Sequence, residues 1–261
     1  MRENLLPLLI NPYTGNSLKM DNEVLVDEIT GERYNIINGM PVLYREDEVQ
    51  GLNRLYQKRY DWLVYIYDFM MLTLSPLIGG KEAFRSIAEI IEINRGELVL
   101  ETSVGTGIEI KNLVDHGKIA DYYGMDISYG MLKRCRRNAL KWNIDIKLVQ
   151  GNAETVPFKD ELFDVVFHIG GINFFNDKEK AIQEMIRVAK PGARIYICDE
   201  TVTQIEKQPK IISLFYQKPD PEVYEPPLKF IPGNMLNVVN HMLWDEKMYL
   251  ISFQKPEVNS V

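Results

Sequence analysis

Apolar residues are spaced in two different ways along the chain, and the spacing changes near residue 96. From there on, short apolar runs alternate with segments of helical periodicity. The runs predict strands at 98–102, 122–125, 146–150, 163–169 and 194–198, and the segments between them predict helices at 108–116, 130–142 and 177–189. Buried strands that alternate with helices form parallel sheets through right-handed crossovers, so we expect a doubly wound α/β domain over residues 96–261. Two final runs, 235–243 and 248–253, have no helix between them and predict an antiparallel end to the sheet.

The first 95 residues predict two smaller regions. Residues 1–49 are turn-rich, with strand candidates at 24–26 and 34–43, and the second contains Asn38-Gly39, a dipeptide typical of tight hairpin turns. We expect a small β unit there. Residues 50–95 carry apolar and aromatic side chains at helical spacing, with a second helix at 83–93 after Gly79-Gly80. We interpret them as a helical cap or linker, which either covers a pocket or packs against the domain core.

Composition and charge narrow the class of protein. The chain has 261 residues, of which 46% are hydrophobic and 26% charged, as in ordinary globular proteins. A net charge of −7 gives no general attraction for phosphate backbones or anionic membranes, so we expect no nucleic-acid partner and interpret the basic residues of 133–141 as a solvated helix face. Asp68 interrupts the apolar segment 62–78, so we expect no stable membrane insertion. Two cysteines and the lack of a signal-peptide pattern favour a cytoplasmic location.

A glycine turn follows the first strand of the predicted sheet. The run Val99-Leu100-Glu101-Thr102-Ser103-Val104-Gly105-Thr106-Gly107 is an apolar strand that ends in an acid and continues into small residues. Such turns let a cofactor approach the backbone closely. A dinucleotide fingerprint needs a third glycine where this chain has Ile110, and a phosphate loop needs a Gly-Lys-Ser/Thr sequence that does not follow. The turn therefore predicts a cofactor of another kind.

The pattern Glu101-x-Ser103-x-Gly105-x-Gly107 resembles motif I of the class I (Rossmann-like) S-adenosylmethionine-dependent methyltransferases, and the likeness is to the small-molecule, type 11 branch. That motif is acid-x-Gly-x-Gly-x-Gly. The segments 123–128, 151–158, 162–166, 184–193 and 250–256 also follow the family's order, so the resemblance covers residues 96–256. It implies a mostly parallel seven-stranded sheet, S-adenosylmethionine as cofactor and S-adenosylhomocysteine as product.

The resemblance also implies roles for single residues. Asp126 would accept hydrogen bonds from both ribose hydroxyls, and Asn152 from the adenine amine. Ser103 stands in place of the family's first glycine and would be strained if that position needed a positive φ. His168, at the end of a strand, is either a cofactor contact or a general base, with Asp199 and Glu200 as weaker candidates. The full expected set of cofactor contacts is Glu101, Ser103, Gly105, Thr106, Gly107, Met125, Asp126, Ile127, Asn152, Ala153, Glu154 and His168.

Residues 1–49 contain two short motifs with the spacing of a zinc ribbon. Asn11-x-x-Thr14 and Asp27-x-x-Thr30 fall where a zinc ribbon carries two Cys-x-x-Cys pairs, and each pair is followed by glycine. The run resembles the Trm112-like segment that precedes some small-molecule methyltransferases. Zinc sites favour thiolate and imidazole ligands, and none of these four positions is cysteine, so we expect no metal. An unrelated pair of β-hairpins stays open as the alternative.

These observations together predict an enzyme that methylates a small, aromatic or apolar acceptor. We expect the aromatic residues of 56–69 and the connection 201–234 to cover that acceptor. Methyl transfer from a sulfonium depends mainly on alignment, so no obligatory triad or metal is required. Two alternatives stay open: a sensor or interaction protein that binds the cofactor without methyl transfer, and other S-adenosylmethionine chemistry on the same fold, such as aminopropyl transfer.

Overall fold

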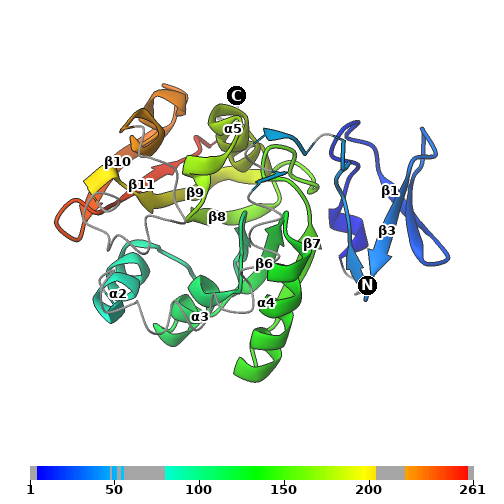
Figure 1. Ribbon diagram of the computed structural model, residues 1–261, viewed down its shortest axis with the longest axis horizontal. Helices are drawn as coiled ribbons and strands as arrows, with labels where there is room; N and C mark the ends of the chain where they lie inside the picture. The colour runs from blue at the N-terminus through cyan, green and yellow to red at the C-terminus, as the bar shows by residue number, and fades with distance from the viewer. Residues whose placement is uncertain (1–4, 48, 52–53, 56–79, 204–220, 258–261) are drawn as a thin grey trace.

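The structure is a computed structural model that describes residues 5–47, 49–51, 54–55, 80–203 and 221–257 (Figure 1). It contains a seven-stranded mixed sheet and a four-stranded antiparallel sheet near the N-terminus. The predicted doubly wound fold with a small β unit is therefore confirmed. Most of the expected cap at 50–95 and half of the expected covering connection at 201–234 lie outside the described residues, so the proposed domain division stays a prediction.

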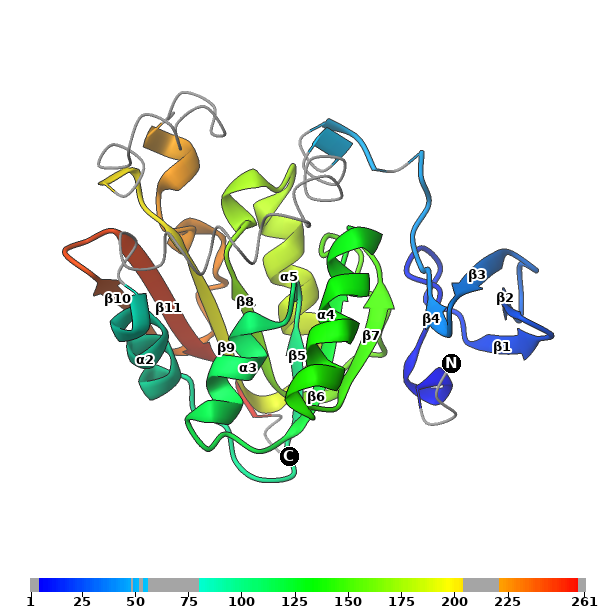
Figure 2. The same cartoon turned by 60° about the horizontal axis from the view of Figure 1, so that its bottom comes forward.

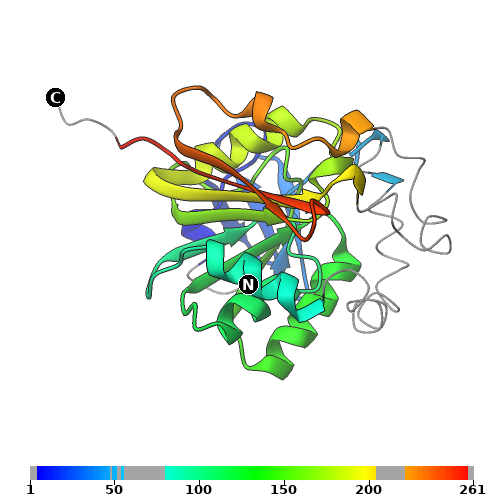
Figure 3. The same ribbon diagram turned by 90° about the vertical axis from the view of Figure 1, so that its left-hand side faces the viewer.

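The seven-stranded sheet has the order β10-β11-β9-β8-β5-β6-β7. Its parallel part consists of β5 (Leu98–Glu101), β6 (Asp121–Asp126), β7 (Ile146–Gln150), β8 (Phe163–Ile169) and β9 (Ala189–Glu200). Strands β10 (Leu236–Leu243) and β11 (Met248–Gln254) form two antiparallel pairs, β10 with β11 and β11 with β9, as the two final apolar runs predict. They form the end of the sheet opposite β7 (Figure 3). β9 begins earlier than predicted, because Ala189 already pairs with Phe163 as soon as the preceding helix ends.

Helices cover both faces of this sheet (Figures 1 and 2). Helices α2 (Gly80–Ile90), α3 (Ile108–Asp115) and α4 (Tyr129–Trp142) lie on one face, and α5 (Lys178–Val188) lies on the other. Polar caps fix where the later helices start: Ser128 accepts the N–H of Met131 at α4, and Asp177 accepts that of Lys180 at α5. Helix α2 begins at Gly80 and ends at Ile90, three residues earlier at each end than the predicted 83–93.

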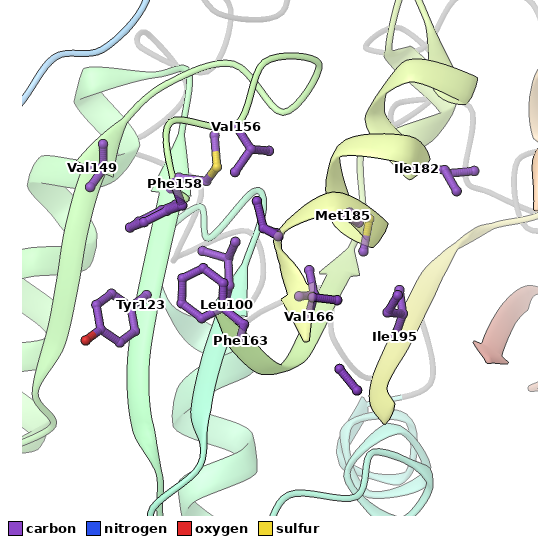
Figure 4. Close-up of a cluster of buried hydrophobic side chains, with 14 of the residues drawn as sticks. Leu100, Tyr123, Val149, Val156, Phe158, Phe163, Val166, Ile182, Met185 and Ile195 are labelled. Atoms are coloured by element: carbon purple, nitrogen blue, oxygen red, sulfur yellow. The ribbon is translucent and has the colours of Figure 1, made fainter. Parts of the chain in front are cut away.

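Alternating residues of each strand supply two separate apolar cores. Val99 packs with the helices α2, α3 and α4, whereas its neighbour Leu100 packs with α5. Figure 4 shows part of the second cluster, in which the rings of Tyr123, Phe158 and Phe163 meet edge to face with centroids 5.1–6.0 Å apart. A sheet packed on both faces is rigid, so the ends of its strands can hold side chains in fixed positions.

The small sheet lies beside β7, which is an edge strand of the large sheet (Figure 2). It consists of β1 (Leu18–Asp21), β2 (Val24–Asp27), β3 (Arg33–Ile37) and β4 (Met40–Pro41), of which the sequence analysis missed β1. The N–H of Leu43 donates to the carbonyl of Gln150 at 2.8 Å, and that of Ile10 to the carbonyl of Pro157 at 3.1 Å. Because Leu25 and Tyr34 share an apolar cluster with Phe158, the small sheet is packed against the larger domain.

Candidate cofactor site

The carboxyl ends of the central parallel strands meet at one edge of the large sheet. Glu101 at the end of β5 is in register with Gly124 of β6 and with Phe167 of β8. The strand order reverses at β5, because β6 and β7 follow on one side of it and β8 then pairs with its other side. Ligands of open α/β sheets bind at this point, where the strand order reverses. The structure therefore brings Glu101, Asp126 and His168 to the same edge.

The turn after β5 contains two glycines whose backbone conformation other residues rarely adopt. Gly105 has a φ of +51° and Gly107 a φ of +81°, a left-handed conformation that favours glycine. At Gly107 a Cβ would also lie 2.8 Å from the Sγ of Cys135. Ser103 is not among the described residues with positive φ, so the strain considered for this position does not arise. Serine fits the turn without distorting it.

Asp126 is tied directly to this turn. Its Oδ2 accepts the N–H of Gly105 at 2.9 Å, and its Oδ1 accepts the N–H of Ser128 at 2.8 Å. A carboxylate oxygen can accept more than one hydrogen bond, so these two bonds do not by themselves block a ligand. The two backbone bonds fix the orientation of the carboxylate, as recognition of two neighbouring hydroxyls requires.

Two carboxyl groups on either side of the turn in the sequence each have a buried oxygen. Glu101 is only 1% exposed, and within the described part of the chain nothing bonds to its Oε2. Glu109, in the first turn of α3, likewise has a buried Oε2 that no described group contacts by a hydrogen bond. Burial raises the pKa of Glu101 well above its ordinary value, with smaller contributions from Glu109 and Asp126, and burial raises the pKa of Glu109 to about 8. The sequence analysis missed Glu109, although an acid between Ile108 and Ile110 at the start of a helix was a signal.

His168, near the end of β8, is fully buried. Its Nδ1 lies 3.3 Å from the hydroxyl of Thr102, its ring packs edge to face with Phe175 at 5.1 Å, and its Nε2 has no partner among the described residues. Burial lowers the pKa of this imidazole to about 4, so it is neutral at pH 7. Thr102 is a further residue of this site that the sequence analysis did not single out.

The weaker candidates Asp199 and Glu200 lie at the end of β9. Asp199 accepts the N–H groups of Gly171 and Asn173 at 3.1 and 2.9 Å, and it thereby fixes the loop that follows His168. Burial raises the pKa of Asp199 despite these bonds, and burial together with the charge of Asp199 raises the pKa of Glu200 to about 8. These contacts give Asp199 a structural role in the loop.

The segment 151–154 forms a tight internal turn. The side chain of Asn152 accepts the N–H of Glu154 at 3.0 Å, and the carboxylate of Glu154 accepts the N–H groups of Asn176 and Asp177 at 2.9 and 3.1 Å. Glu154 thus supports the start of α5. Met125 is fully buried in the core, whereas Ile127 is only half-buried and is the more accessible of the two residues beside Asp126. The adenine contacts expected from Met125, Ile127, Asn152, Ala153 and Glu154 stay predictions, as does the contact expected from Thr106, which is buried with its carbonyl bonded to Asn138.

Four positions of the small sheet correspond to the cysteines of a zinc ribbon, and three of them donate hydrogen bonds to the carboxylate of the fourth, Asp27. Asn11 Nδ2 and Thr14 Oγ1 donate to Asp27 Oδ2 at 2.7 and 2.8 Å, and the N–H of Thr30 donates to Asp27 Oδ1 at 2.8 Å. Among the described residues, no group of three His, Cys, Asp or Glu side chains is placed to hold a metal ion. The Trm112-like origin of this unit stays a prediction.

The residues at the carboxyl edge fit S-adenosylmethionine by their chemistry. Glu101 offers a buried, unpartnered carboxyl oxygen to a cationic group, and Asp126 offers two oriented oxygens to vicinal hydroxyls. The turn between them, with Gly105 and Gly107, permits close approach of a ligand that has no phosphate to neutralise. The family resemblance implied all of these features, and the fold places them at one edge of the sheet.

Comparisons with known proteins agree with this chemistry. A family model described as a methyltransferase domain matches residues 100–197. A demethylmenaquinone methyltransferase of Renibacterium salmoninarum is 33% identical over 44% of this chain and 46% of its own length. A ubiquinone/menaquinone biosynthesis C-methyltransferase of Azotobacter vinelandii is 34% identical over 51% of this chain and 53% of its own length. The chain therefore spans about half the length of the curated relatives it matches.

Solved structures share the fold at low identity. An S-adenosylmethionine-dependent methyltransferase from Aquifex aeolicus matches with a TM-score of 0.51 and 17% identity, over 66% of this chain and 88% of its own. A phosphoethanolamine N-methyltransferase of Haemonchus contortus in complex with S-adenosylmethionine matches with a TM-score of 0.60 and 14% identity, over 83% of this chain and 62% of its own. The sheet and these matches show the class I, Rossmann-like methyltransferase fold. S-adenosylmethionine is the cofactor of methyltransferases with this fold, and the family model matches the part of the sheet from β5 to β9.

One further finding concerns membranes. No helix in the described ranges is both long enough and apolar enough to cross a bilayer.

Proposed function

We propose that this protein transfers a methyl group from S-adenosylmethionine to a small aromatic or apolar acceptor. The observation that carries this proposal is the unpartnered, buried carboxyl of Glu101 beside a left-handed glycine turn that is bonded to Asp126. When bound, the cofactor would supply a methyl group on a sulfonium. A nucleophile attacks the methyl carbon in line, and S-adenosylhomocysteine is the leaving group. Every other contribution has to come from the residues of the chain.

Those residues mainly bind and orient. Glu101 would accept hydrogen bonds from the cofactor's ammonium, and Asp126 would accept them from the ribose hydroxyls. Because the backbone N–H groups of Gly105 and Ser128 fix the Asp126 carboxylate, this carboxylate is already oriented before a cofactor binds. Alignment of this kind lowers the barrier of a two-reactant step by several kcal/mol, on the order of 7–11 in well-oriented cases.

His168 is the residue we propose as a proton acceptor. Its pKa of about 4 leaves the imidazole neutral at pH 7, so one ring nitrogen has a lone pair for a substrate proton, although burial makes it a weak base. If the Thr102 hydroxyl accepts from Nδ1–H, the lone pair lies on Nε2, which no described residue engages. A phenol or hydroquinone that loses its proton to Nε2 becomes a much stronger nucleophile at the oxygen and at the adjacent ring carbon.

The acceptor we favour is a hydroquinone ring. The curated relatives named above are quinone methyltransferases, one of them described as a C-methyltransferase. A hydroquinone is small, flat and apolar and has the acidic hydroxyl that a neutral histidine base can use.

The test is methyl transfer from labelled S-adenosylmethionine by the purified protein. We expect label in a demethylated naphthohydroquinone and none in phosphoethanolamine, which has no ring or phenolic hydroxyl. His168→Ala should lower kcat by about 100-fold or more with little change in cofactor affinity, as loss of a general base does. If the cofactor binds but no acceptor is labelled, a cofactor-binding sensor becomes the better interpretation. An unchanged rate in the His168 variant would remove the base.

A further inference from the structure

Glu109 is not among the residues to which a role is assigned above, yet one of its carboxyl oxygens is buried without a hydrogen bond from any described residue. It lies in the first turn of α3, directly after Gly107, on the face of the sheet toward which Glu101 also points. The charge of Glu109 contributes to the raised pKa of Glu101 on β5 and of Cys198 on β9, so its carboxyl is within electrostatic range of both groups. Its Oε2 is buried, and no partner for it exists in the described part of the molecule.

We propose that Glu109 is a second carboxylate for the cofactor and holds the ammonium of the methionine end together with Glu101. This inference rests on the proposed use of S-adenosylmethionine. Two observations support it independently of each other: the buried, unpartnered oxygen of Glu101, which is itself only 1% exposed, and the second unpartnered oxygen on a different element.

The chemistry of the pair selects a cation with several donors. Two neighbouring buried carboxylates repel each other, so in the free protein at least one of them keeps a proton. An ammonium has three N–H donors and can bond to both groups at once, which satisfies the oxygens and removes the repulsion. A neutral ligand part, such as the adenosine moiety, has nothing to offer this pair.

The groups around the pair make it a cation site as well. Asp126 of β6 and Glu109 both raise the pKa of Glu101, and Cys135 of α4 and Tyr122 of β6 feel the charge of Glu101. Burial raises the pKa of Glu109 itself to about 8. Binding of an ammonium therefore drives a proton off the pair near pH 7, and cofactor affinity should rise between pH 6 and pH 8.

The experiment is calorimetric titration of the full chain and of Glu109→Gln with three ligands. S-adenosylmethionine has an ammonium and a sulfonium, S-adenosylhomocysteine has only the ammonium, and methylthioadenosine has neither. We expect Glu109→Gln to weaken the first two by about 10- to 100-fold, the range for loss of a charged hydrogen-bond partner, and to leave methylthioadenosine unchanged. Repeating the titrations in two buffers of different ionisation enthalpy should show fewer protons released by the variant.

Asp115→Asn is the matched control, because Asp115 lies on the same helix, exposed and paired only at the surface with Lys111. Equal affinities of Glu109→Gln and this control for S-adenosylhomocysteine would overturn the inference. Weaker binding of S-adenosylmethionine alone would also overturn it, since the sulfonium and not the ammonium would then be the partner. Failure of the unaltered protein to bind any of the three ligands would instead overturn the proposed function.

Discussion

Buried carboxylates occur in both sheets of this protein, and their surroundings are opposite. Asp27, at the end of β2, is 1% exposed and accepts hydrogen bonds from Asn11, Thr14, Asn16 and the N–H groups of Ile29 and Thr30. Glu101, at the end of β5, is equally buried, and its Oε2 has no such partner among the residues described. The protein itself supplies hydrogen-bond donors to both oxygens of Asp27, whereas no described residue donates to Oε2 of Glu101.

The pKa values show the consequence. Burial alone would raise the pKa of Asp27, but the hydrogen bonds from Thr30, Ile29, Thr14 and Asn11 overcome it and hold that pKa well below its ordinary value. Burial raises the pKa of Glu101 well above its ordinary value, because nothing comparable opposes it. A satisfied buried carboxylate stabilises the fold, whereas an unsatisfied one destabilises it until a ligand arrives. The comparison therefore separates a structural acid from a binding acid.

The largest expected effect is on the structural acid. Asp27→Asn places an amide donor against the donors of Asn11, Thr14 and Thr30, and we expect a loss of about 3–5 kcal/mol in the free energy of unfolding, the usual cost of breaking a buried charged network. Chemical denaturation followed by circular dichroism measures it. Asp21→Asn in β1 is the control, because its ion pair with Arg33 is exposed and should contribute less than about 1 kcal/mol. Equal losses in the two variants would contradict the structural role.

The binding acid should respond in the opposite direction. Glu101→Gln removes a buried, repelled carboxyl, so we expect the free protein to be unchanged or slightly more stable at pH 7. Cofactor affinity should fall by about 100-fold, through loss of the charged contact to the ammonium. Thermal unfolding with and without S-adenosylhomocysteine measures both effects in one experiment. A destabilised free protein would mean that Glu101 is structural, like Asp27.

The two carboxylates also predict opposite pH dependence of stability. The pKa of Asp27 is lowered on folding, so its contribution is present above the unfolded value near 3.8 and is lost as the pH falls. The pKa of Glu109 is raised from 4.5 to about 8, so the folded state keeps a proton that the unfolded chain loses, and stability falls as the pH rises from about 4.5 to 8. One such group contributes at most ~1.4 kcal/mol per pH unit.

Unfolding of the ligand-free protein between pH 5 and pH 8 checks this dependence. The difference in stability between Glu109→Gln and the unaltered protein should be smallest at pH 5 and grow toward pH 8. A difference that does not change with pH would show that Glu109 does not titrate in this range.

The smallest expected effect is at Ser103. Since its φ is not positive, Ser103→Gly relieves no strain, and we expect it to lower stability by less than about 1 kcal/mol through the greater freedom of the unfolded chain. Cofactor affinity should change by less than about twofold. A clear gain in affinity on calorimetric titration would show that the serine does obstruct the turn.

The sequence by itself determined the framework of this protein. The strands β7 and β8 match their predicted ranges, and the antiparallel end of the sheet follows from two consecutive apolar runs without a helix. The glycine turn with Glu101 and the placement of Asp126 were readable for the same reason. Each depends on residues that are close in sequence, whose periodicity and turn chemistry act locally.

Only the tertiary structure decided which polar groups face one another. Glu109 is an ordinary helical acid in the sequence, and its charge acts on Glu101 only because α3 packs on the face of the sheet to which Val99 contributes. Asp27 is an ordinary turn residue until the chain from Asn11 to Asn16 folds over it. Hydrogen bonding and burial act between segments that are distant in sequence. Whether a buried carboxylate receives hydrogen bonds is therefore decided only when those segments pack together.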